Sequence, residues 1–414
     1  MSRTLVIQLA RFGDLVQTKR LVMSLAQEEG GEVHLCLDRS LVPLARLIYP
    51  FAQPHGLLVH GQADAAAFLA ANAPVLARLR DLGFDLIYNL NFSGLNFALA
   101  ALFDPATVRG YRMRKGQQIK DRWPAMAFRW TRRRGSSPMN LADFWAHLHP
   151  APIAPGEVNP PAQPGGQGLG VVLAGRHARR SLPTEVLGRV VAAMAAKIKQ
   201  GPILLLGSQA ERAAAADLKR QLPGRLLDRT SDLTGRTDWA QLLESLSGLD
   251  AVLSPDTGTM HLAAHAGAPV TALFLSSAWA WETGPYGLGH QVWQSAAECA
   301  PCRESDPCPH GLRCLEPFSQ GPLLSALSGR AAAPQGLLLL DSALDELGAA
   351  YVPASGQDPA AADRLQARAL LAEFLRAPLA AAPRGAEGEY RPELSLFRDP
   401  DWMAPPPDAA SALN

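Results

Sequence analysis

Short apolar runs alternate with longer segments of helical period along most of this chain. Residues 4–9 (TLVIQL) and 33–37 are typical of buried strands, and residues 15–29 between them have the spacing of an amphipathic helix. The same alternation continues through residues 56–60, 63–82 and 84–89, and it resumes at 169–173, 184–199 and 202–206. Strands that alternate with helices in this way predict α/β architecture with parallel sheets.

The stretch 253–274 (LSPDTGTMHLAAHAGAPVTALF) contains the most informative turn. An apolar run ends at residue 253, a turn follows over 254–259, and a helix over 260–266 precedes a second strand at 270–275. Ligands of open α/β sheets bind at the carboxyl ends of strands, and the positive end of a helix attracts phosphate. Asp256 and Thr257 can cap the helix, and Gly258 permits close approach of a ligand. An ordinary βαβ corner with good caps is the alternative interpretation.

Length and proline content divide the chain into parts. At 414 residues it exceeds one ordinary hydrophobic core, and residues 150–170 are rich in Pro, Gly, Ala and Gln. We therefore expect an α/β fold of two Rossmann-like, doubly wound domains at 1–155 and 169–345, with a linker at 156–168 and an extension at 346–414. Residues 5–10 are not followed by a Gly-x-Gly-x-x-Gly fingerprint, which argues against a nicotinamide or flavin site.

Composition narrows the class of protein. Hydrophobic residues make up 48% and charged residues 19%, which indicates a globular chain, and a net charge of +1 argues against wholesale nucleic-acid binding. No apolar run has the length of a transmembrane helix. Residues 2–10 are interpreted as a first strand rather than a signal peptide, because Arg11 and Asp14 follow and no cleavage site does. The expected location is the cytoplasm.

Residues 109–134 are strongly basic, with aromatic residues interleaved and Asp121 as the one acid. Three interpretations stay open: a solvated helix face, a surface for an anionic acceptor or anionic membrane, and a nucleic-acid surface. The absence of a nucleic-acid-binding motif makes the third the weakest, and the anionic acceptor is slightly favoured over the first.

Four of the five cysteines are grouped near the end of the second predicted domain. Cys299, Cys302, Cys308 and Cys314 follow the spacing C-x2-C-x5-C-x5-C, whereas Cys36 lies in a predicted core strand. A structural zinc or iron ion, reduced packing cysteines and oxidised pairs are the three interpretations. The group follows the predicted ligand turns rather than lining them, so a catalytic role is not expected.

Four segments of the chain, taken in order, resemble glycosyltransferase family 9, the ADP-heptose:lipopolysaccharide heptosyltransferases. They are Phe12-Gly13-Asp14-Leu15-Val16-Gln17-Thr18, the basic loop around Arg180-Ser181-Leu182-Pro183, Asp232-Leu233-Thr234-Gly235, and Asp256-Thr257-Gly258-Thr259-Met260-His261-Leu262-Ala263. The fourth segment is specific, and the first three are useful jointly.

The resemblance implies a GT-B fold, with two Rossmann-like domains facing each other across a cleft. It implies an inverting, metal-independent enzyme without a cofactor for catalysis, which moves heptose from ADP-heptose onto a lipopolysaccharide-core-like, anionic glycolipid acceptor. The N-terminal domain would bind the acceptor and the C-terminal domain the nucleotide-sugar. Peripheral contact with the inner membrane is part of this expectation, and nucleic acid is not.

The resemblance also assigns roles to residues. Asp14 matches the catalytic base, and a helix cap is its alternative role. Arg180 falls at a phosphate-contacting lysine, and the turn at 256–259 faces the diphosphate. His261 either binds the donor or packs inside its helix, and Glu211 either contacts ribose or is a surface carboxylate. The expected nucleotide-sugar site is Arg180, Glu211, Asp256, Thr257, Gly258, Thr259 and His261, and the expected acceptor site is Arg112, Arg114, Lys115 and Lys120.

Two departures from the family pattern leave the donor open. Leu182 stands where the family usually has Trp, and residues 275–279 (LSSAW) replace the usual Gly-(Pro)-Thr/Ser, although Gly284-Pro285-Tyr286-Gly287 recovers the later turn. The alternatives are a transferase that uses another nucleotide-sugar for a different glycan or a protein, and a non-catalytic nucleotide-sugar or metal-binding protein.

Overall fold

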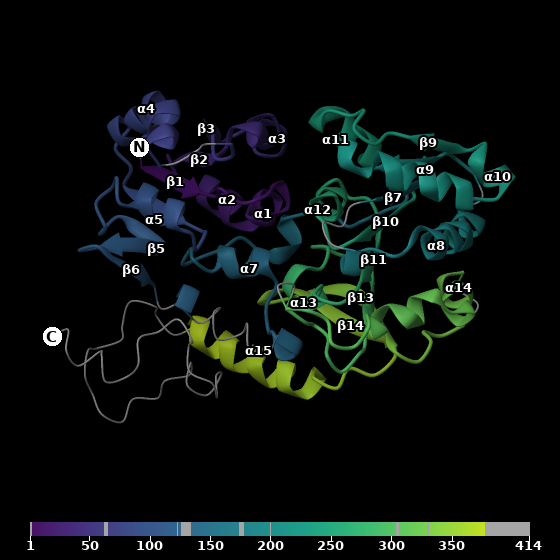
Figure 1. Cartoon of the computed structure of the whole chain (residues 1–414). Helices are drawn as coiled ribbons and strands as arrows, with labels where there is room; N and C mark the ends of the chain where they lie inside the picture. The colour runs from purple at the N-terminus through teal and green to yellow at the C-terminus, as the bar shows by residue number, and fades with distance from the viewer. Residues whose placement is uncertain are drawn as a thin grey trace. The chain divides into compact units, whose positions relative to one another are not determined.

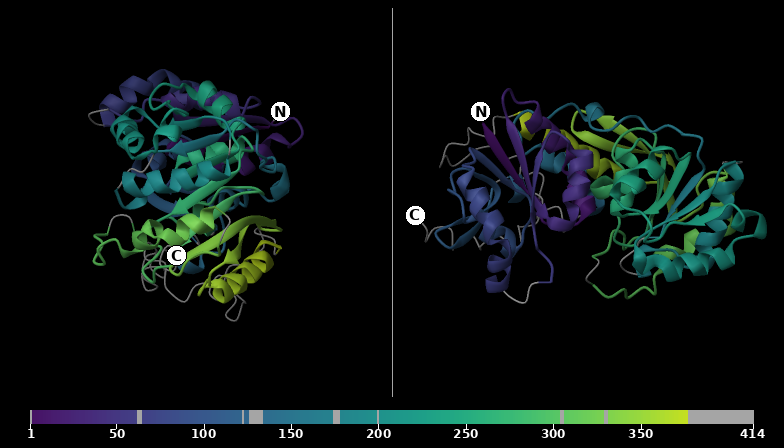
Figure 2. Two further views of the ribbon diagram at one scale, coloured as in Figure 1. Left: turned by 90° about the vertical axis from the view of Figure 1, so that its right-hand side faces the viewer. Right: turned by 90° about the horizontal axis from the view of Figure 1, so that it is seen from above.

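The computed structural model describes residues 2–61, 65–121, 123–125, 134–173, 178–198, 200–303, 306–328 and 331–376. These residues form two compact units (Figures 1 and 2). In the described part of the chain, unit 1 holds residues up to Pro138, Phe144–Ile153 and residues 361–376, and unit 2 holds Met139–Asp143 and Ala154–Ala360. Residues 377–414 of the extension predicted at 346–414 lie outside the described residues.

Unit 1 is built on a sheet of six described strands in the order β3-β2-β1-β4-β5-β6. Neighbouring strands are parallel from β3 to β5, and only β6 is antiparallel to its neighbour. The order reverses between β1 and β4, where crevices for ligands form in such sheets. The strands are β1 (Arg3–Ile7), β2 (Glu32–Asp38), β3 (Gln53–Leu57), β4 (Leu86–Asn89), β5 (Val108–Arg114) and β6 (Gln117–Lys120).

The described helices of this part of the chain include α1 (Phe12–Gln17), α2 (Lys19–Ala26), α3 (Val42–Ile48), α4 (Ala65–Asp81), α5 (Gly94–Ala100) and α7 (Leu141–Ala146). The sequence predicted one helix over 15–29, and the structure has two. The break is at Thr18, whose hydroxyl donates to the carbonyl of Leu15 at 2.6 Å. Competition of a threonine hydroxyl for a helical carbonyl explains the interruption.

Unit 2 contains a sheet of eight described strands in the order β14-β13-β12-β11-β10-β7-β8-β9. The strands from β12 to β9 are parallel neighbours, and β13 and β14 add an antiparallel edge. The strands are β7 (Leu169–Val172), β8 (Ile203–Leu206), β9 (Thr230–Asp232), β10 (Ala251–Pro255), β11 (Val270–Phe274), β12 (Gln291–Ser295), β13 (Leu337–Asp345) and β14 (Gly348–Ser355). The sheet therefore extends past residue 345, where the sequence placed the end of this domain.

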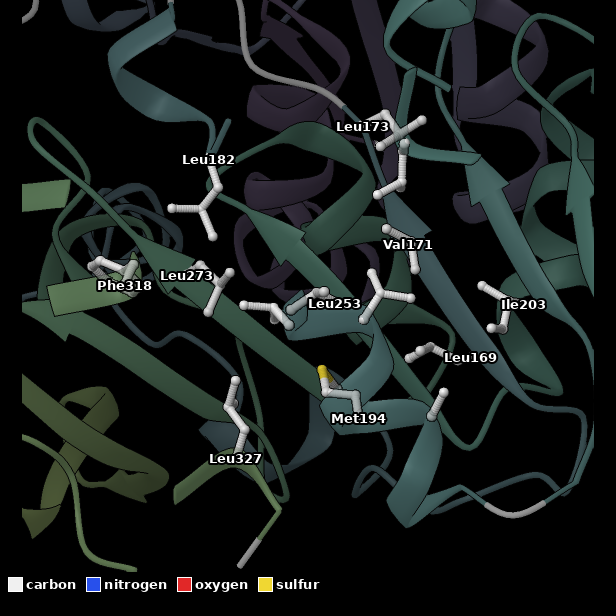
Figure 3. Packing of buried hydrophobic residues seen from close by; sticks show 14 of the residues in the cluster. Leu169, Val171, Leu173, Leu182, Met194, Ile203, Leu253, Leu273, Phe318 and Leu327 are labelled. Atoms are coloured by element: carbon white, nitrogen blue, oxygen red, sulfur yellow. The ribbon is translucent and has the colours of Figure 1, made fainter. Parts of the chain in front are cut away.

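Apolar side chains of the central strands hold unit 2 together (Figure 3). Leu253 of β10 and Leu273 of β11 are buried together with Met194 of α8 (Thr184–Lys197). Pro183 is the N-cap residue of α8, and no side chain makes a capping hydrogen bond there. The remaining described helices of this unit are α9 (Arg212–Gln221), α10 (Gly224–Leu227), α11 (Trp239–Ser247), α12 (Gly258–His265), α13 (Ala280–Thr283) and α14 (Gly321–Leu327).

The proline-rich segment predicted as a linker at 156–168 is packed along unit 2. Its backbone N–H groups at Ala162, Gln163 and Gly165 donate to Leu288, Gly267 and Leu249. The side chain of Asn159 also donates to the carbonyl of Tyr286 at 2.9 Å. These bonds make the segment part of the unit rather than a free tether.

The last described helix, α15 (Ala361–Arg376), belongs to unit 1 although it follows the sheet of unit 2. Arg364 and Arg368 are buried, and they donate to the carbonyls of Gly135 and Pro138. Phe374 stacks on Trp123 with ring centroids 6.2 Å apart. The chain thus returns to its first unit through buried cations and an aromatic stack.

β3 lies at one edge of the sheet of unit 1, and β14 lies at one edge of the sheet of unit 2. Each of these two edge strands contains a proline. Pro54 pairs with Leu35 of β2, and Pro353 pairs with Leu340 of β13. Because a proline has no N–H, each of these edge strands lacks one backbone hydrogen-bond donor.

None of the helices in the described residues has both the length and the apolar character needed to cross a bilayer.

Candidate functional site

The turn between β10 and α12 is formed as the sequence predicted, within unit 2. The extended residue Thr257 is the N-cap of α12, which begins at Gly258. The Ser254 hydroxyl donates to the carbonyl of Pro255 at 2.8 Å and lies 3.3 Å from the Thr257 hydroxyl. The N–H groups of Gly258 and Thr259 fall in the first helical turn, where a helix supplies no carbonyl acceptors. This turn therefore presents N–H donors and the positive end of a helix dipole.

Arg180 is held against this turn by Asp256. Its Nη2 donates to the Asp256 carboxylate and to the Asp256 backbone carbonyl, both at 2.8 Å. The Thr283 hydroxyl donates to the same carboxylate oxygen at 3.1 Å. Both charged side chains are mostly buried, with 16% and 12% exposed, so the pair fixes the guanidinium beside the first turn of α12. Asp256 is thus a support for Arg180 rather than a helix cap.

His261 is buried inside α12, with 5% of its surface exposed. Burial lowers the pKa of its imidazole to about 3, and the nearby positive charge of Arg180 contributes in the same direction. His261 is therefore neutral at physiological pH. Its burial matches the packing interpretation, and its electrostatic interaction with Arg180 places it next to the candidate donor site.

Glu211 ends the short helix η5 (Gln209–Glu211) that follows β8. Its Oε2 accepts from the backbone N–H of Ser208 at 2.8 Å and from the Ser208 hydroxyl at 2.7 Å. The carboxylate thus closes a capping box at the carboxyl end of a parallel strand. Its part in ribose binding stays a prediction.

Asp14 lies in the first turn of α1, directly after β1, in unit 1. Its Oδ2 accepts from the backbone N–H of Arg11 at 3.1 Å. Burial raises the pKa of this half-buried carboxyl, and the hydrogen bond from Arg11 opposes that shift. A raised pKa is what a general base needs near neutral pH. The same carboxylate caps the helix and has the electrostatic setting of a base.

The predicted acceptor residues share the β5–β6 hairpin of unit 1. Lys115 and Gly116 form its tip with φ of 49° and 77°, as in a type I′ turn. Arg112 forms an ion pair with Asp121 at 2.9 Å, and Lys120 Nζ lies 5.7 Å from the centre of the Phe92 ring. Arg114 and Lys115 are exposed at the tip. The basic segment up to residue 121 is therefore a hairpin and not a helix face, and residues 126–133 lie outside the described part of the chain.

Three polar residues near these sites escaped the sequence analysis. Thr283 supports Asp256 through a contact that no local pattern announces. Lys19 at the start of α2 is half-buried, and burial lowers the pKa of its amine to about 8. Gln8 follows β1 and is 2% exposed. The one sequence feature that could have indicated Gln8 as a site residue is its position as a polar residue at the end of an apolar run.

The four grouped cysteines lie close enough to influence one another's ionisation. The thiols of Cys299, Cys302 and Cys308 all act to raise the pKa of Cys314, after burial as the largest cause. None of the four forms a disulfide bond in this structure. In the described residues no three His, Cys, Asp or Glu side chains are arranged to hold a metal ion. The structure therefore gathers the thiols without forming a ligand set, and Cys36 is buried in the core as predicted.

The cysteine segment contacts the loop that carries Arg180 through Arg179. Arg179 donates to the carbonyls of Asp306 and Arg303 at 2.7 and 3.1 Å. Its own carbonyl accepts from the Ser276 hydroxyl at 2.8 Å, and the carbonyl of Ser276 accepts from the N–H of Cys302. Arg179, the residue that precedes Arg180, thus links this segment to the loop that carries Arg180.

Solved structures with the same fold support the GT-B assignment. A family 9 glycosyltransferase from Veillonella parvula has a TM-score of 0.58 at 14% identity, covering 71% of this chain and 87% of its own. The E. coli ADP-heptose lipopolysaccharide heptosyltransferase II has a TM-score of 0.52 at 15% identity, covering 70% and 90%. E. coli heptosyltransferase WaaC, solved with ADP, has a TM-score of 0.55 at 13% identity, covering 71% and 93%. These identities establish similarity of fold.

A family model matches part of the chain by sequence. Residues 191–310 match the model of glycosyltransferase family 9 (heptosyltransferase), a range that includes the turn at 256–259 but neither Asp14 nor Arg180. No curated protein matches the chain. The resemblance of this chain to the heptosyltransferases of glycosyltransferase family 9 is therefore confirmed, over residues 191–310 and on a GT-B type fold of two parallel-dominated sheets.

Proposed function

We propose that this protein is an inverting glycosyltransferase that moves heptose from ADP-heptose onto a lipopolysaccharide-core-like acceptor. The observation that carries the proposal is the pairing of Arg180 with Asp256 beside the first turn of α12. A guanidinium fixed next to free N–H donors is a suitable seat for a leaving diphosphate. The family match over this turn and the heptosyltransferase names of two similar folds support heptose as the sugar.

The nucleotide-sugar would be held mainly by positive charge and by backbone N–H groups. Gly258 and Thr259 supply N–H groups, the hydroxyl of Thr257 lies at the same turn, and Arg180 supplies positive charge. Neutral His261 adds no charge that would compete with Arg180. Glu211, which follows the carboxyl end of β8, is the proposed contact of the nucleotide ribose.

The transfer would be a single displacement without a metal ion. Asp14 takes the proton of the acceptor hydroxyl as the hydroxyl oxygen forms a bond to the anomeric carbon. The bond from that carbon to the diphosphate oxygen breaks, and the electron pair leaves with ADP. Arg180 and the first-turn N–H groups stabilise the negative charge that develops on the departing diphosphate. Inversion at the anomeric carbon follows from the single displacement.

An anionic glycolipid is the proposed acceptor, bound by the β5–β6 hairpin of unit 1. Arg114 and Lys115 are exposed at the tip of that hairpin and suit phosphate or carboxylate groups. The same charges would favour peripheral contact with the anionic inner leaflet from the cytoplasm.

We keep a structural zinc or iron ion at the four cysteines as a separate proposal. Cys299, Cys302, Cys308 and Cys314 provide thiol ligands suited to either metal. The mutual influence of their thiols places them in one neighbourhood, although the present arrangement is not a ligand set. No step of the transfer depends on this ion.

A panel of nucleotide-sugars tests the function. ADP-heptose should raise the melting temperature of the protein, because a ligand of the native state stabilises it by mass action. UDP- and GDP-sugars should not, and mass spectrometry should detect transfer to deacylated core oligosaccharide. Stabilisation by UDP- or GDP-sugars alone would move the donor assignment to another nucleotide-sugar. Binding without transfer to glycan or protein acceptors would favour a non-catalytic role.

A further inference from the structure

A network of side-chain amides lies where the strand order of unit 1 reverses, at the carboxyl ends of β1 and β4. Asn91 Oδ1 accepts from the backbone N–H of Leu9 at 2.7 Å, and Asn91 Nδ2 donates to Gln8 Oε1 at 2.5 Å. Asn96 Nδ2 donates to Asn89 Oδ1 at 2.9 Å. Gln8, Asn89 and Asn96 are all almost fully buried, at 2%, 0% and 1% exposure.

Backbone groups fix the orientation of these amides. The N–H of Leu9 requires an oxygen on Asn91, so the Asn91 NH₂ group must point toward Gln8. Gln8 must therefore present its oxygen, which also accepts from the N–H of Ala10 at 3.3 Å. The Gln8 Nε2 group is left as a buried donor with no hydrogen-bond partner among the described residues.

An unmatched buried donor is costly, so its retention calls for an acceptor oxygen at that point. Most other polar groups of the network have partners: Asn89 Nδ2 donates to the carbonyl of Tyr111 at 2.7 Å, and Asn96 Oδ1 accepts from the Ser93 hydroxyl at 2.8 Å. Gln8 Nε2 is thus the one amide nitrogen of this network for which the described part of the chain supplies no acceptor.

Gln8 and Asp14 flank the same turn. The consecutive N–H groups of Ala10 and Arg11 donate to Gln8 Oε1 at 3.3 Å and to Asp14 Oδ2 at 3.1 Å. Consecutive backbone nitrogens are separated by less than about 3.8 Å, so the two side-chain oxygens lie within about 10 Å of each other. One sugar residue can span that distance.

We propose that Gln8 is an acceptor-binding residue whose Nε2 group donates a hydrogen bond to a hydroxyl of the sugar that Asp14 activates. This inference rests on the proposed function. The ligand is a neutral hydroxyl rather than a phosphate, because the side chains of the network are neutral amides. Gln8 thereby orients the acceptor while the basic hairpin attracts its charged groups.

Gln8→Glu tests this assignment, because it keeps the oxygen that Ala10 and Asn91 need and removes the donor. At pH 8 the variant should raise the KM for core oligosaccharide at least tenfold, with the KM for the donor unchanged. Asn72→Asp is the matched control: Asn72 is a buried amide of α4 whose Oδ1 accepts from the N–H of Leu58 and whose Nδ2 donates to Phe68. The control should leave the acceptor KM within twofold, even if it lowers the melting temperature.

A crystal structure of the wild-type protein with core oligosaccharide decides the matter if Gln8→Glu does not fold. A sugar hydroxyl within hydrogen-bond distance of Gln8 Nε2 supports the assignment, and a water molecule there with the sugar bound elsewhere overturns it. An acceptor KM within twofold of wild type in a folded Gln8→Glu variant overturns it as well. Failure of the wild-type protein to transfer sugar from any donor would instead remove the proposed function itself.

Discussion

Arg180 donates to both the carboxylate and the backbone carbonyl of Asp256, so a single guanidinium nitrogen is tied to the turn at two points. Thr283 binds the same carboxylate from α13. The cation is therefore positioned before any donor arrives, and little reorganisation is needed when a diphosphate binds or departs.

Removing the positive charge of Arg180 should raise the KM for the nucleotide-sugar. We expect Arg180→Met to raise the KM for the nucleotide-sugar by about 10- to 100-fold, because a charge-assisted contact to phosphate is lost. Asp256→Asn should give a smaller rise, since the arginine keeps its charge but loses its ionic anchor. Steady-state kinetics with varied donor would measure both effects.

Arg229→Met is the control for that experiment. Arg229 directs its guanidinium to the carbonyl of Gly201 at 2.6 Å, so its loss should lower stability and leave the donor KM within twofold. Equal donor KM values in Arg180→Met and wild type would contradict the phosphate role of Arg180.

Asp14→Asn should separate catalysis from folding. Asparagine can still accept the N–H of Arg11, but it cannot take a proton from the acceptor, so kcat should fall by about 10²- to 10⁴-fold. The melting temperature should stay the same or rise, because the carboxylate charge is disfavoured by burial. Donor affinity, measured by calorimetry, should be retained. A variant with wild-type kcat would exclude Asp14 as the base.

The hairpin tip should govern the acceptor and not the donor. Arg114→Gln combined with Lys115→Asn removes two exposed charges, and asparagine tolerates the positive φ of residue 115. We expect the KM for an anionic acceptor to rise about tenfold at low salt and the difference to shrink at high salt. Arg39→Gln with Arg46→Gln removes two exposed charges elsewhere in unit 1 and should have no such effect.

Acid should destabilise the fold through buried histidines. Burial lowers the pKa of His55 and of His290 to about 4, whereas an unfolded histidine titrates near about 6.5. The unfolded chain therefore binds more protons between these values, and stability is lost as the pH falls from about 6.5 toward about 4. Each histidine should cost about 2 kcal/mol of unfolding free energy between pH 7 and pH 5.

Denaturant titrations at pH 7, 6 and 5 measure this loss. His290→Asn should fold, because an asparagine oxygen can replace Nδ1 as the acceptor of the Val270 N–H. It should remove the part of the pH dependence of the unfolding free energy that His290 contributes. An unaltered slope in His290→Asn would show that this imidazole is not titrating between the two states.

The metal content of the purified protein should show whether the four grouped cysteines bind an ion. Protein purified under reducing conditions should contain about one zinc or iron ion per chain if the thiols form a site. Cys299→Ser with Cys302→Ser should remove the metal and lower the melting temperature, whereas Cys36→Ser should leave the metal content unchanged. Metal-free wild-type protein with full stability would favour reduced packing cysteines.

The βαβ rhythm and the turn before α12 could be predicted from sequence because they depend on local patterns. The apolar runs at 4–9 and 270–275 overlap β1 and β11, and α12 begins at Gly258 with Thr257 at its N-cap position, although no side chain makes the predicted capping bond there. The confirmed fold follows from these regularities. The assignments of Asp14, Arg180, Glu211 and His261 stay predictions that the proposed experiments test.

Contacts between distant segments could not be predicted in the same way. The sequence gives no sign that Thr283 supports Asp256, or that Asn91 orients the amide of Gln8. It also left a helix face open as one interpretation of residues 109–134, because charge counts do not reveal that Lys115-Gly116 takes left-handed backbone angles and forms a hairpin. Each case depends on tertiary pairing or on a turn whose signal is short.

Pro54 in β3 and Pro353 in β14 bear on how the protein behaves at high concentration. An outermost strand that lacks an N–H cannot serve as a full template for a strand of another copy, so growth of an intermolecular sheet is interrupted at both places. Replacing either proline with valine would restore a donor to an outermost strand, and turbidity or light scattering should then detect self-association that the native chain resists.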